Sequence, residues 1–455
     1  MQRALSLDQS PSLSLTLPLF ANVPFFGLLA AILALYSGPE LFNSRWHPAT
    51  LALTHAWTLG IVGSAMFASL AHILAVACNV RIQIPRSRAL TFWGLFSVGT
   101  LLLITGFISW QSWAYQLAAL CLGLALGAYI ITMAFALWRS RRDVFRGAKE
   151  IVAPIRLALL GLLLTVSTGL IMLIALASEQ NLPNLVSLHI MMGLAAWAGL
   201  LLMAMSFQLV PIFQVTELYP APLVRWLPWG VTALLIAQWA LAFLPGPWLP
   251  VRDLVGYLIF LAYGLWAIVS WVRIWKRKRP TAATSTLFWY SSLSSLLACI
   301  VLNFWANSPS APNADLAIGV LLIMGALGSV VCGMMYTIVP FLLWREAQEH
   351  VSMDADNTEH TRALLRLIPK TAHYMPTFIA RAHWALHSLS ILVWTAASLG
   401  IAFFAWIAAP ILLLSFAALA WNLWTAWQRY RQSLHAMRVY QAEHHIDAKQ
   451  HCPES

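Results

Sequence analysis

The amino-acid sequence predicts an all-α polytopic membrane protein with about twelve transmembrane helices, since its apolar runs are each near the ~20 residues that cross a bilayer core. Composition supports this prediction: 60% of the residues are hydrophobic and only 9% are charged, whereas soluble domains have roughly 25% charged residues. The basic residues also gather on one side of the runs. We therefore exclude a soluble protein and interpret residues 1–455 as a single membrane domain.

The apolar runs place the expected spans in order along the chain. The spans lie near residues 17–36, 50–79, 89–109, 113–138, 154–178, 185–213, 224–245, 252–272, 285–306, 315–344, 382–403 and 408–428. Many of the 23 tryptophans fall at span ends, as Trp46, Trp110 and Trp248 do. Tryptophan rings favour the head-group level of a bilayer, so these positions agree with the proposed ends.

Basic residues orient the chain. Of the 27 Lys and Arg residues, 25 lie in the two tails or in the loops that follow even-numbered spans. The two exceptions are Arg45 and Arg252, which follow odd-numbered spans. Positive charge stays cytoplasmic, so both termini are expected inside a bacterial plasma membrane, and span 1 is expected to act as an uncleaved insertion signal. The net charge of +11 comes from clusters beside spans, such as 139–142 and 276–279. We expect these clusters to meet lipid head groups rather than nucleic acid.

Two segments are expected to lie outside the bilayer on the cytoplasmic side. The longer loop is 345–381, and the tail is 429–455. Residues 361–368 of the loop suit a short interfacial helix with its apolar side chains, Leu364, Leu365 and Ile368, toward lipid. The tail is expected to begin as a basic helical extension of the last span.

An internal repeat relates spans 2, 6 and 10, which are four spans apart. Span 6 ends with Val210-Pro211 and span 10 ends with Val339-Pro340, and both are long and contain glycine. This pattern predicts three pseudo-repeated units of four helices, with the three spans lining a common interior around a site. The alternative is that Gly and Pro are simply frequent in membrane helices.

Histidines are the ionisable residues expected within the spans, because no Asp, Glu, Lys or Arg lies deep in any of them. That absence argues against an ion-coupled carrier and against most hydrolytic mechanisms. His55 and His189 lie at one depth, near the outer ends of spans 2 and 6. A metal or haem iron is one partner for such imidazoles. Otherwise each ring bonds a Ser, a Thr or a carbonyl on a neighbouring helix. We expect Thr54, Ser187 or Asp315 to orient the two rings.

The other histidines and the cysteines are expected to have packing or surface roles. His72 lies seventeen residues, roughly 25 Å, beyond His55, so the two cannot share a site. His383 and His387 share a helix face, but we expect them at a helix end or among head groups. Met324 draws attention because a thioether in the outer half of span 10 is a possible iron or copper ligand. The five cysteines are expected to act in packing rather than in disulfides or metal sites: Cys78, Cys121, Cys299, Cys332 and Cys452.

Twelve spans in three units, with His55 and His189 near the outer ends of spans 2 and 6, resemble the main subunit of haem–copper oxidases. The segments 53–60 and 335–341 look like bacterial membrane proteins related to that superfamily, and the layout is similar to that of NnrS-type proteins linked to nitric oxide stress. The resemblance implies that His55 binds a low-spin haem b and that His189 binds copper or serves as the opposite haem ligand. Unlike that family, the chain has no histidine at 223–245 or 315–320.

The resemblance therefore implies a core subunit without most catalytic metal ligands rather than a complete terminal oxidase or nitric oxide reductase. It implies a role in respiration or in the response to nitric oxide, with a respiratory redox partner. Two other functions remain open: a permease or facilitator for an uncharged solute, and a non-catalytic assembly scaffold.

Orientation is directly testable. Because the basic residues place the C-terminus in the cytoplasm, a C-terminal green fluorescent protein fusion should be fluorescent and a C-terminal alkaline phosphatase fusion inactive. A phosphatase fusion of high activity would contradict the orientation and reverse the expected depth of every histidine.

Overall fold

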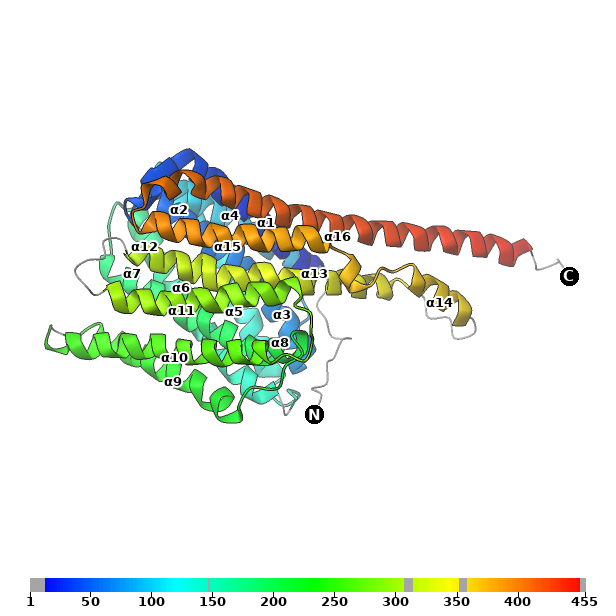
Figure 1. The fold of residues 1–455 in the computed structure, drawn as a ribbon, viewed down its shortest axis with the longest axis horizontal. Coiled ribbons are helices and arrows are strands. Elements are labelled where there is room, and N and C mark those ends of the chain that lie inside the picture. Colours follow the sequence, from blue (N-terminus) through cyan, green and yellow to red (C-terminus); the bar gives the residue numbers. More distant parts are fainter. Residues whose placement is uncertain (1–12, 146–147, 245, 307–313, 352–357, 451–455) are drawn as a thin grey trace.

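The computed structural model describes residues 13–145, 148–244, 246–306, 314–351 and 358–450, and within these ranges it contains helices and no strand. Ten of the described helices are long and apolar enough to cross a membrane. The expected spans 7 and 11 correspond to α9 (Ala221–Leu241) and α15 (Thr377–Ser398), which are long helices but are not among these ten. The all-α membrane fold is thus confirmed, and the count of twelve spans stays a prediction (Figure 1).

The helices follow one another in three sets of four. The first set is α1 (Leu13–Ser37), the compound helix α2–η3–α3 (Pro48–Cys78), α4 (Arg86–Ser109) and α5 (Ser112–Arg139). The second is α6 (Lys149–Ala177), α7–η5–α8 (Pro183–Phe213), α9 and α10 (Leu249–Trp275). The third is α11 (Thr284–Ala306), α12–η7–α13 (Ala314–Glu349), α15 and α16 (Ala402–Gln450), with α14 (Thr358–Arg366) inserted before α15.

Each compound helix contains a π-helical segment that begins in its N-terminal half. These segments are η3 (Ala56–Gly63), η5 (Met191–Gly199) and η7 (Leu321–Gly328), and each ends at a glycine. The first helix of each set packs on the π segment: α1 on η3, α6 on η5 and α11 on η7. Because π segments are rare in proteins, their recurrence in all three sets supports the repeat beyond the general frequency of Gly and Pro.

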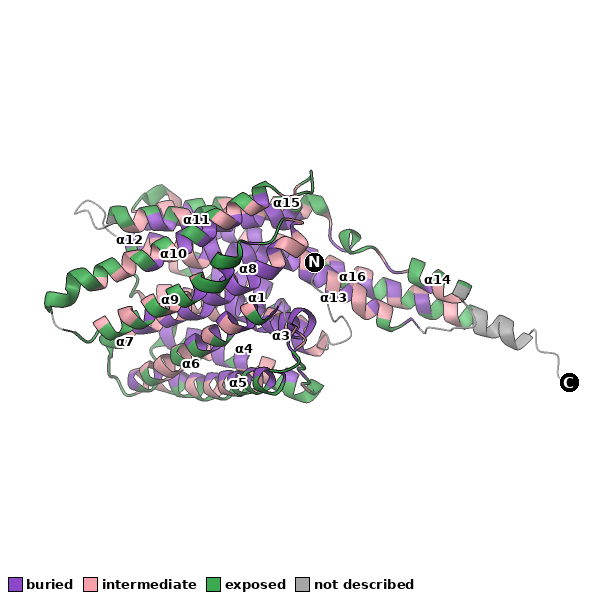
Figure 2. Cartoon of the chain, turned by 90° about the horizontal axis from the view of Figure 1, so that it is seen from below, coloured by how far each residue is buried: buried purple, intermediate pink, exposed green. Residues whose placement is uncertain are grey.

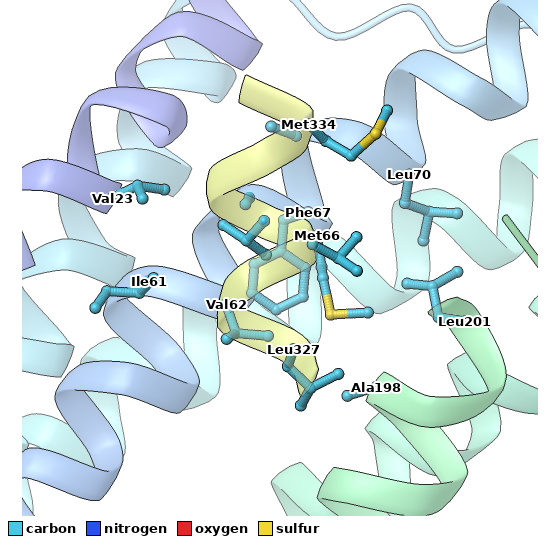
Figure 3. Close-up of a cluster of buried hydrophobic side chains, with 14 of the residues drawn as sticks. Val23, Ile61, Val62, Met66, Phe67, Leu70, Ala198, Leu201, Leu327 and Met334 are labelled. Carbon is cyan, nitrogen blue, oxygen red and sulfur yellow. The ribbon is translucent and has the colours of Figure 1, made fainter. Parts of the chain in front are cut away.

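The three sets close into a ring. Helix α5 packs on α6, α10 on α11, and α16 returns to pack on α1. The compound helices converge inside this ring, where Met66 and Leu70 of α3 lie near Leu201 of α8 and Met334 of α13 (Figure 3). Buried residues concentrate along α3, whereas α9 is largely exposed to the surroundings (Figure 2). Spans 2, 6 and 10 thus line one interior, as the sequence predicts.

Small residues allow these helices to approach. A side chain at Gly60 would overlap the ring of Phe26 on α1. A Cβ atom at Gly161 of α6 would lie 2.6 Å from the backbone carbon of Ala196 in η5. A backbone atom cannot swing aside as a side chain can, so the contact at Gly161 sets the distance between α6 and η5.

A fully bonded asparagine joins three helices of the first set. The Asn22 amide nitrogen donates to Ser64 Oγ (3.1 Å) and to Ser97 Oγ (3.0 Å). Its oxygen accepts from Trp93 Nε1 at 3.0 Å. In a medium without water such an amide is stable only when its donors and acceptor are paired, so Asn22 fixes α1 against α3 and α4.

One end of the helical bundle carries a small helical extension. Helix α16 continues to Gln450, which confirms the helical tail, and it projects beyond the bundle beside α14 (Figure 1). The expectation that the apolar residues of 361–368 face lipid is wrong for Leu364 and Ile368, which are only 0% and 8% exposed within the protein, whereas Leu365 is exposed. The ring of His360 on α14 contacts Tyr440 of α16. Residues 352–357 of the predicted loop and Cys452 lie outside the described residues.

The close contact at Gly161 predicts a stability difference between two Gly→Ala variants. Gly161→Ala should destabilise the protein by about 1–3 kcal/mol, since the added methyl meets backbone. Gly127→Ala on α5, where a Cβ meets nothing within 4 Å, should be neutral or stabilising through helix propensity. Thermal unfolding in detergent, followed by tryptophan fluorescence, compares them. Equal melting temperatures would contradict the α6–η5 contact.

Candidate functional site

The structure brings His55 and His189 together. His55 is the last residue of α2 (Pro48–His55) and directly precedes η3, whereas His189 lies in α7 (Pro183–Ile190), two residues before η5 begins. The two ring centroids are 6.5 Å apart, with 26° between the ring planes. Residues 134 positions apart in the sequence thus become neighbours at the boundary between the first and second sets of helices.

Backbone carbonyls hold both imidazoles by the same nitrogen. His55 Nδ1 lies 2.8 Å from the Leu51 carbonyl oxygen. His189 Nδ1 lies 3.1 Å from the Thr165 carbonyl oxygen and 3.2 Å from Thr168 Oγ1. A carbonyl only accepts, so Nδ1 must carry the hydrogen in each neutral ring and Nε2 keeps its lone pair. The expected orienting residues Thr54, Ser187 and Asp315 are therefore wrong: Thr54 bonds Thr50, and Asp315 pairs with Arg45.

The surroundings of the pair are apolar and closely fitted. The ring of Phe107 on α4 lies 5.0 Å from that of His55. On the other side a Cβ atom at Gly169 of α6 would come within 3.0 Å of the His189 ring. Both histidines are half-buried. The glycine leaves room for the His189 ring, and the partial exposure leaves the pair open to a ligand.

The donor chemistry of the pair fits a metal or a haem iron. Two neutral imidazoles with free Nε2 lone pairs are ligands that iron, copper and zinc accept. Metal–nitrogen bonds are about 2.0–2.1 Å long, so a shared metal needs the two nitrogens at most about 4 Å apart, and the two ring centres lie 6.5 Å apart. A backbone hydrogen bond to the second ring nitrogen is the usual way that proteins orient a ligating histidine.

The third set of helices has no histidine at the corresponding position, where Val320 precedes η7. It carries instead a separate cluster of Cys332 on α13 with His383 and His387 on α15. Their ligand atoms all lie within 4.8 Å of one another. All three residues are 0% exposed. The expectation that His383 and His387 lie at a helix end or among head groups is therefore wrong, because packing of α15 against α11 and α13 covers them.

Sequence reasoning missed this cluster for two reasons. The i,i+4 spacing of His383 and His387 was a genuine signal, but their proximity to the cytoplasmic end of the span favoured a surface role. Cys332 had no sequence signal, since it belongs to no CxxC pair and lies more than fifty residues from either histidine. His72 is buried beside the ring of Phe341.

The central helices also enclose a small apolar cavity of about 50 Å³. It lies among α3, α8 and α13, and its lining includes Met66, Met205 and Met334. Pockets for small-molecule ligands are roughly 300–1,000 Å³. The cavity is therefore too small to be a passage for an organic solute in this conformation.

No family model matches this chain, and no curated protein is similar to it.

The hydrogen bonds near the cluster predict a contrast between two buried tyrosines. The Tyr336 hydroxyl lies 2.8 Å from His383 Nδ1 and accepts from Asn422 Nδ2 at 3.2 Å. The hydroxyl of Tyr115 has no partner among the described residues. Tyr336→Phe should destabilise the protein by about 1–3 kcal/mol by leaving buried polar atoms unpaired, and Tyr115→Phe should not. Melting temperatures of the two variants in one detergent provide the comparison, and a neutral Tyr336→Phe would contradict the bonded arrangement.

Proposed function

We propose that this protein is an integral plasma-membrane protein that binds a haem, or a copper ion in its place, between His55 and His189. One observation carries the proposal: two repeat-related histidines lie with ring centres 6.5 Å apart, each with Nδ1 bonded to a backbone carbonyl. The resemblance to the core subunit of haem–copper oxidases favours haem b, which His55 and His189 would hold through their ring nitrogens.

The chain's own residues would hold the group and set its surroundings. The Leu51 and Thr165 carbonyls fix the tautomer of each histidine, so that Nε2 is available without loss of a proton. The ring of Phe107 packs against the ring of His55. A haem bound there supplies one-electron redox chemistry or binding of a diatomic gas. This agrees with a role in respiration or in the nitric oxide response, with a respiratory protein as redox partner.

The interior supports a neutral cofactor site better than an ion-coupled carrier. Among the described residues no Asp, Glu, Lys or Arg is buried. Transporters that couple to ions usually place such residues inside the membrane. A facilitator for an uncharged solute and an assembly scaffold are the remaining alternatives, and both predict that the purified protein contains neither haem nor copper.

Spectroscopy of the purified protein tests the proposal. The wild-type protein in detergent should show a reduced-minus-oxidised haem band, or bound copper by elemental analysis if no haem is present. His55→Ala and His189→Ala should each abolish that signal, because a site with one imidazole no longer fixes the group. His72→Ala is the matched control, since His72 is a buried histidine that follows His55 in the same compound helix.

Size-exclusion profiles must first show that each variant is folded. A folded wild-type protein with neither haem nor copper, after expression with added haem precursor and copper, would overturn the proposal in favour of a facilitator or a scaffold. The same conclusion would follow if both histidine variants kept the full signal.

A further inference from the structure

We infer that Cys332, His383 and His387 form a second metal site, which binds Cu(I). This site goes beyond the proposed function and is independent of it, because its three residues lie within the third set of helices, and His55 and His189 contribute nothing to it. The ligand atoms lie within 4.8 Å of one another and come from α13 and α15.

The polar atoms of the cluster are paired on one side only. His383 Nδ1 lies 2.8 Å from the Tyr336 hydroxyl, and His387 Nε2 lies 3.1 Å from Ser329 Oγ. The opposite nitrogen of His383, Nε2, is buried and has no hydrogen-bond partner among the described residues. His387 Nδ1 is also buried without a partner at hydrogen-bond geometry, although the backbone of Met324 approaches the His387 ring. A buried polar atom without a partner costs about 1–3 kcal/mol. A metal ion bound by both nitrogens removes that cost at both rings.

The hydrogen bonds also prepare the two rings for ligation. If Nδ1–H of His383 donates to Tyr336, and Nε2–H of His387 donates to Ser329, each remaining nitrogen presents a lone pair. Asn422 Nδ2 donates to the Tyr336 hydroxyl and holds it in place. The ring of Phe288 on α11 packs against both imidazoles, with centroids 5.0 Å and 5.5 Å away. Such supporting contacts orient metal-binding histidines in known sites.

Ligand type and charge together select the ion. One thiolate and two imidazoles suit copper and zinc rather than magnesium or calcium. No Asp, Glu, Lys or Arg is buried among the described residues, so no permanently charged side chain compensates the site. A thiolate with Cu(I) is neutral, whereas a thiolate with Zn²⁺ leaves one positive charge in a medium of low dielectric constant, which is strongly unfavourable. The interior of this bundle therefore favours the monovalent soft ion.

Binding requires a proton but no electron. The S–H bond of Cys332 breaks, its proton leaves to solvent, and an Sγ–Cu bond forms while copper remains Cu(I). The two imidazoles are already neutral ligands and release no proton. Affinity should therefore rise with pH as one proton is released for each ion bound.

Anaerobic titration of the full-length protein in detergent with Cu(I), held by bicinchoninate as a competing chelator, tests the site. The wild-type protein should retain one copper in this site, and X-ray absorption should show one sulfur and two nitrogen neighbours. Cys332→Ser should lose the sulfur neighbour and bind Cu(I) at least about 10–100-fold more weakly than the wild-type protein. Tyr336→Phe should also bind Cu(I) about 10–100-fold more weakly, because Tyr336 orients His383. Cys299→Ser is the matched control, since Cys299 is a fully buried thiol on α11.

The titration is repeated in the double variant His55→Ala, His189→Ala, which isolates this site from the proposed outer one. Retention of the sulfur-ligated copper there supports the inference even if the proposed function fails. Absence of Cu(I) binding in folded wild-type protein would overturn it, as would an unchanged ligand set in Cys332→Ser or tighter binding of Zn²⁺ than of Cu(I). If Cys332→Ser does not fold, the Cu(I) affinity of His387→Gln and the X-ray absorption spectrum of the wild-type protein with copper test whether these residues bind the ion.

Discussion

Without water in the bilayer core, every polar group must find its partner inside the protein. The helices satisfy their own backbone, so the constraint falls on the polar side chains between them. Asn22 meets it with three bonds to three residues. Trp266 Nε1 donates to Ser206 Oγ, and the Tyr219 hydroxyl donates to Ser270 Oγ. Several buried polar atoms among the described residues have no such partner, and each of them needs a physical explanation. His383 Nε2 and His387 Nδ1 differ from the others because their residues lie beside the buried Cys332 thiol.

The three sets of helices have the same arrangement but carry different candidate ligand residues. Each has a π segment packed against its first helix, and close approach at residues such as Gly60 and Gly161 fixes that packing. Histidines precede the π segment in the first two sets, and Val320 takes that place in the third. The third set instead has its histidines one helix later, on α15. A repeated fold thus positions several candidate sites, and local side chains decide which of them can bind a ligand.

The two candidate sites differ in their access to the surroundings. His55 and His189 are half-buried at the boundary between two sets of helices, so a cofactor can reach them from the edge of the bundle. Cys332, His383 and His387 are fully covered within one set. An ion bound there would be held apart from solvent and would exchange slowly, which is typical of a structural or storage role rather than of rapid turnover.

The sequence alone determined the position of each residue along the membrane normal, because hydropathy and charge depend on that depth. The positions of the spans, the relation of spans 2, 6 and 10, and the common depth of His55 and His189 all follow from that information. The direction in which each helix face points was decided only by tertiary packing. Packing buried Leu364 and Ile368 within the extension formed by α14 and α16. It also brought the Leu51 and Thr165 carbonyls to the two histidines. It also joined Cys332 to His383 and His387, because contacts between distant helices depend on rotation about their axes, which composition and spacing do not encode.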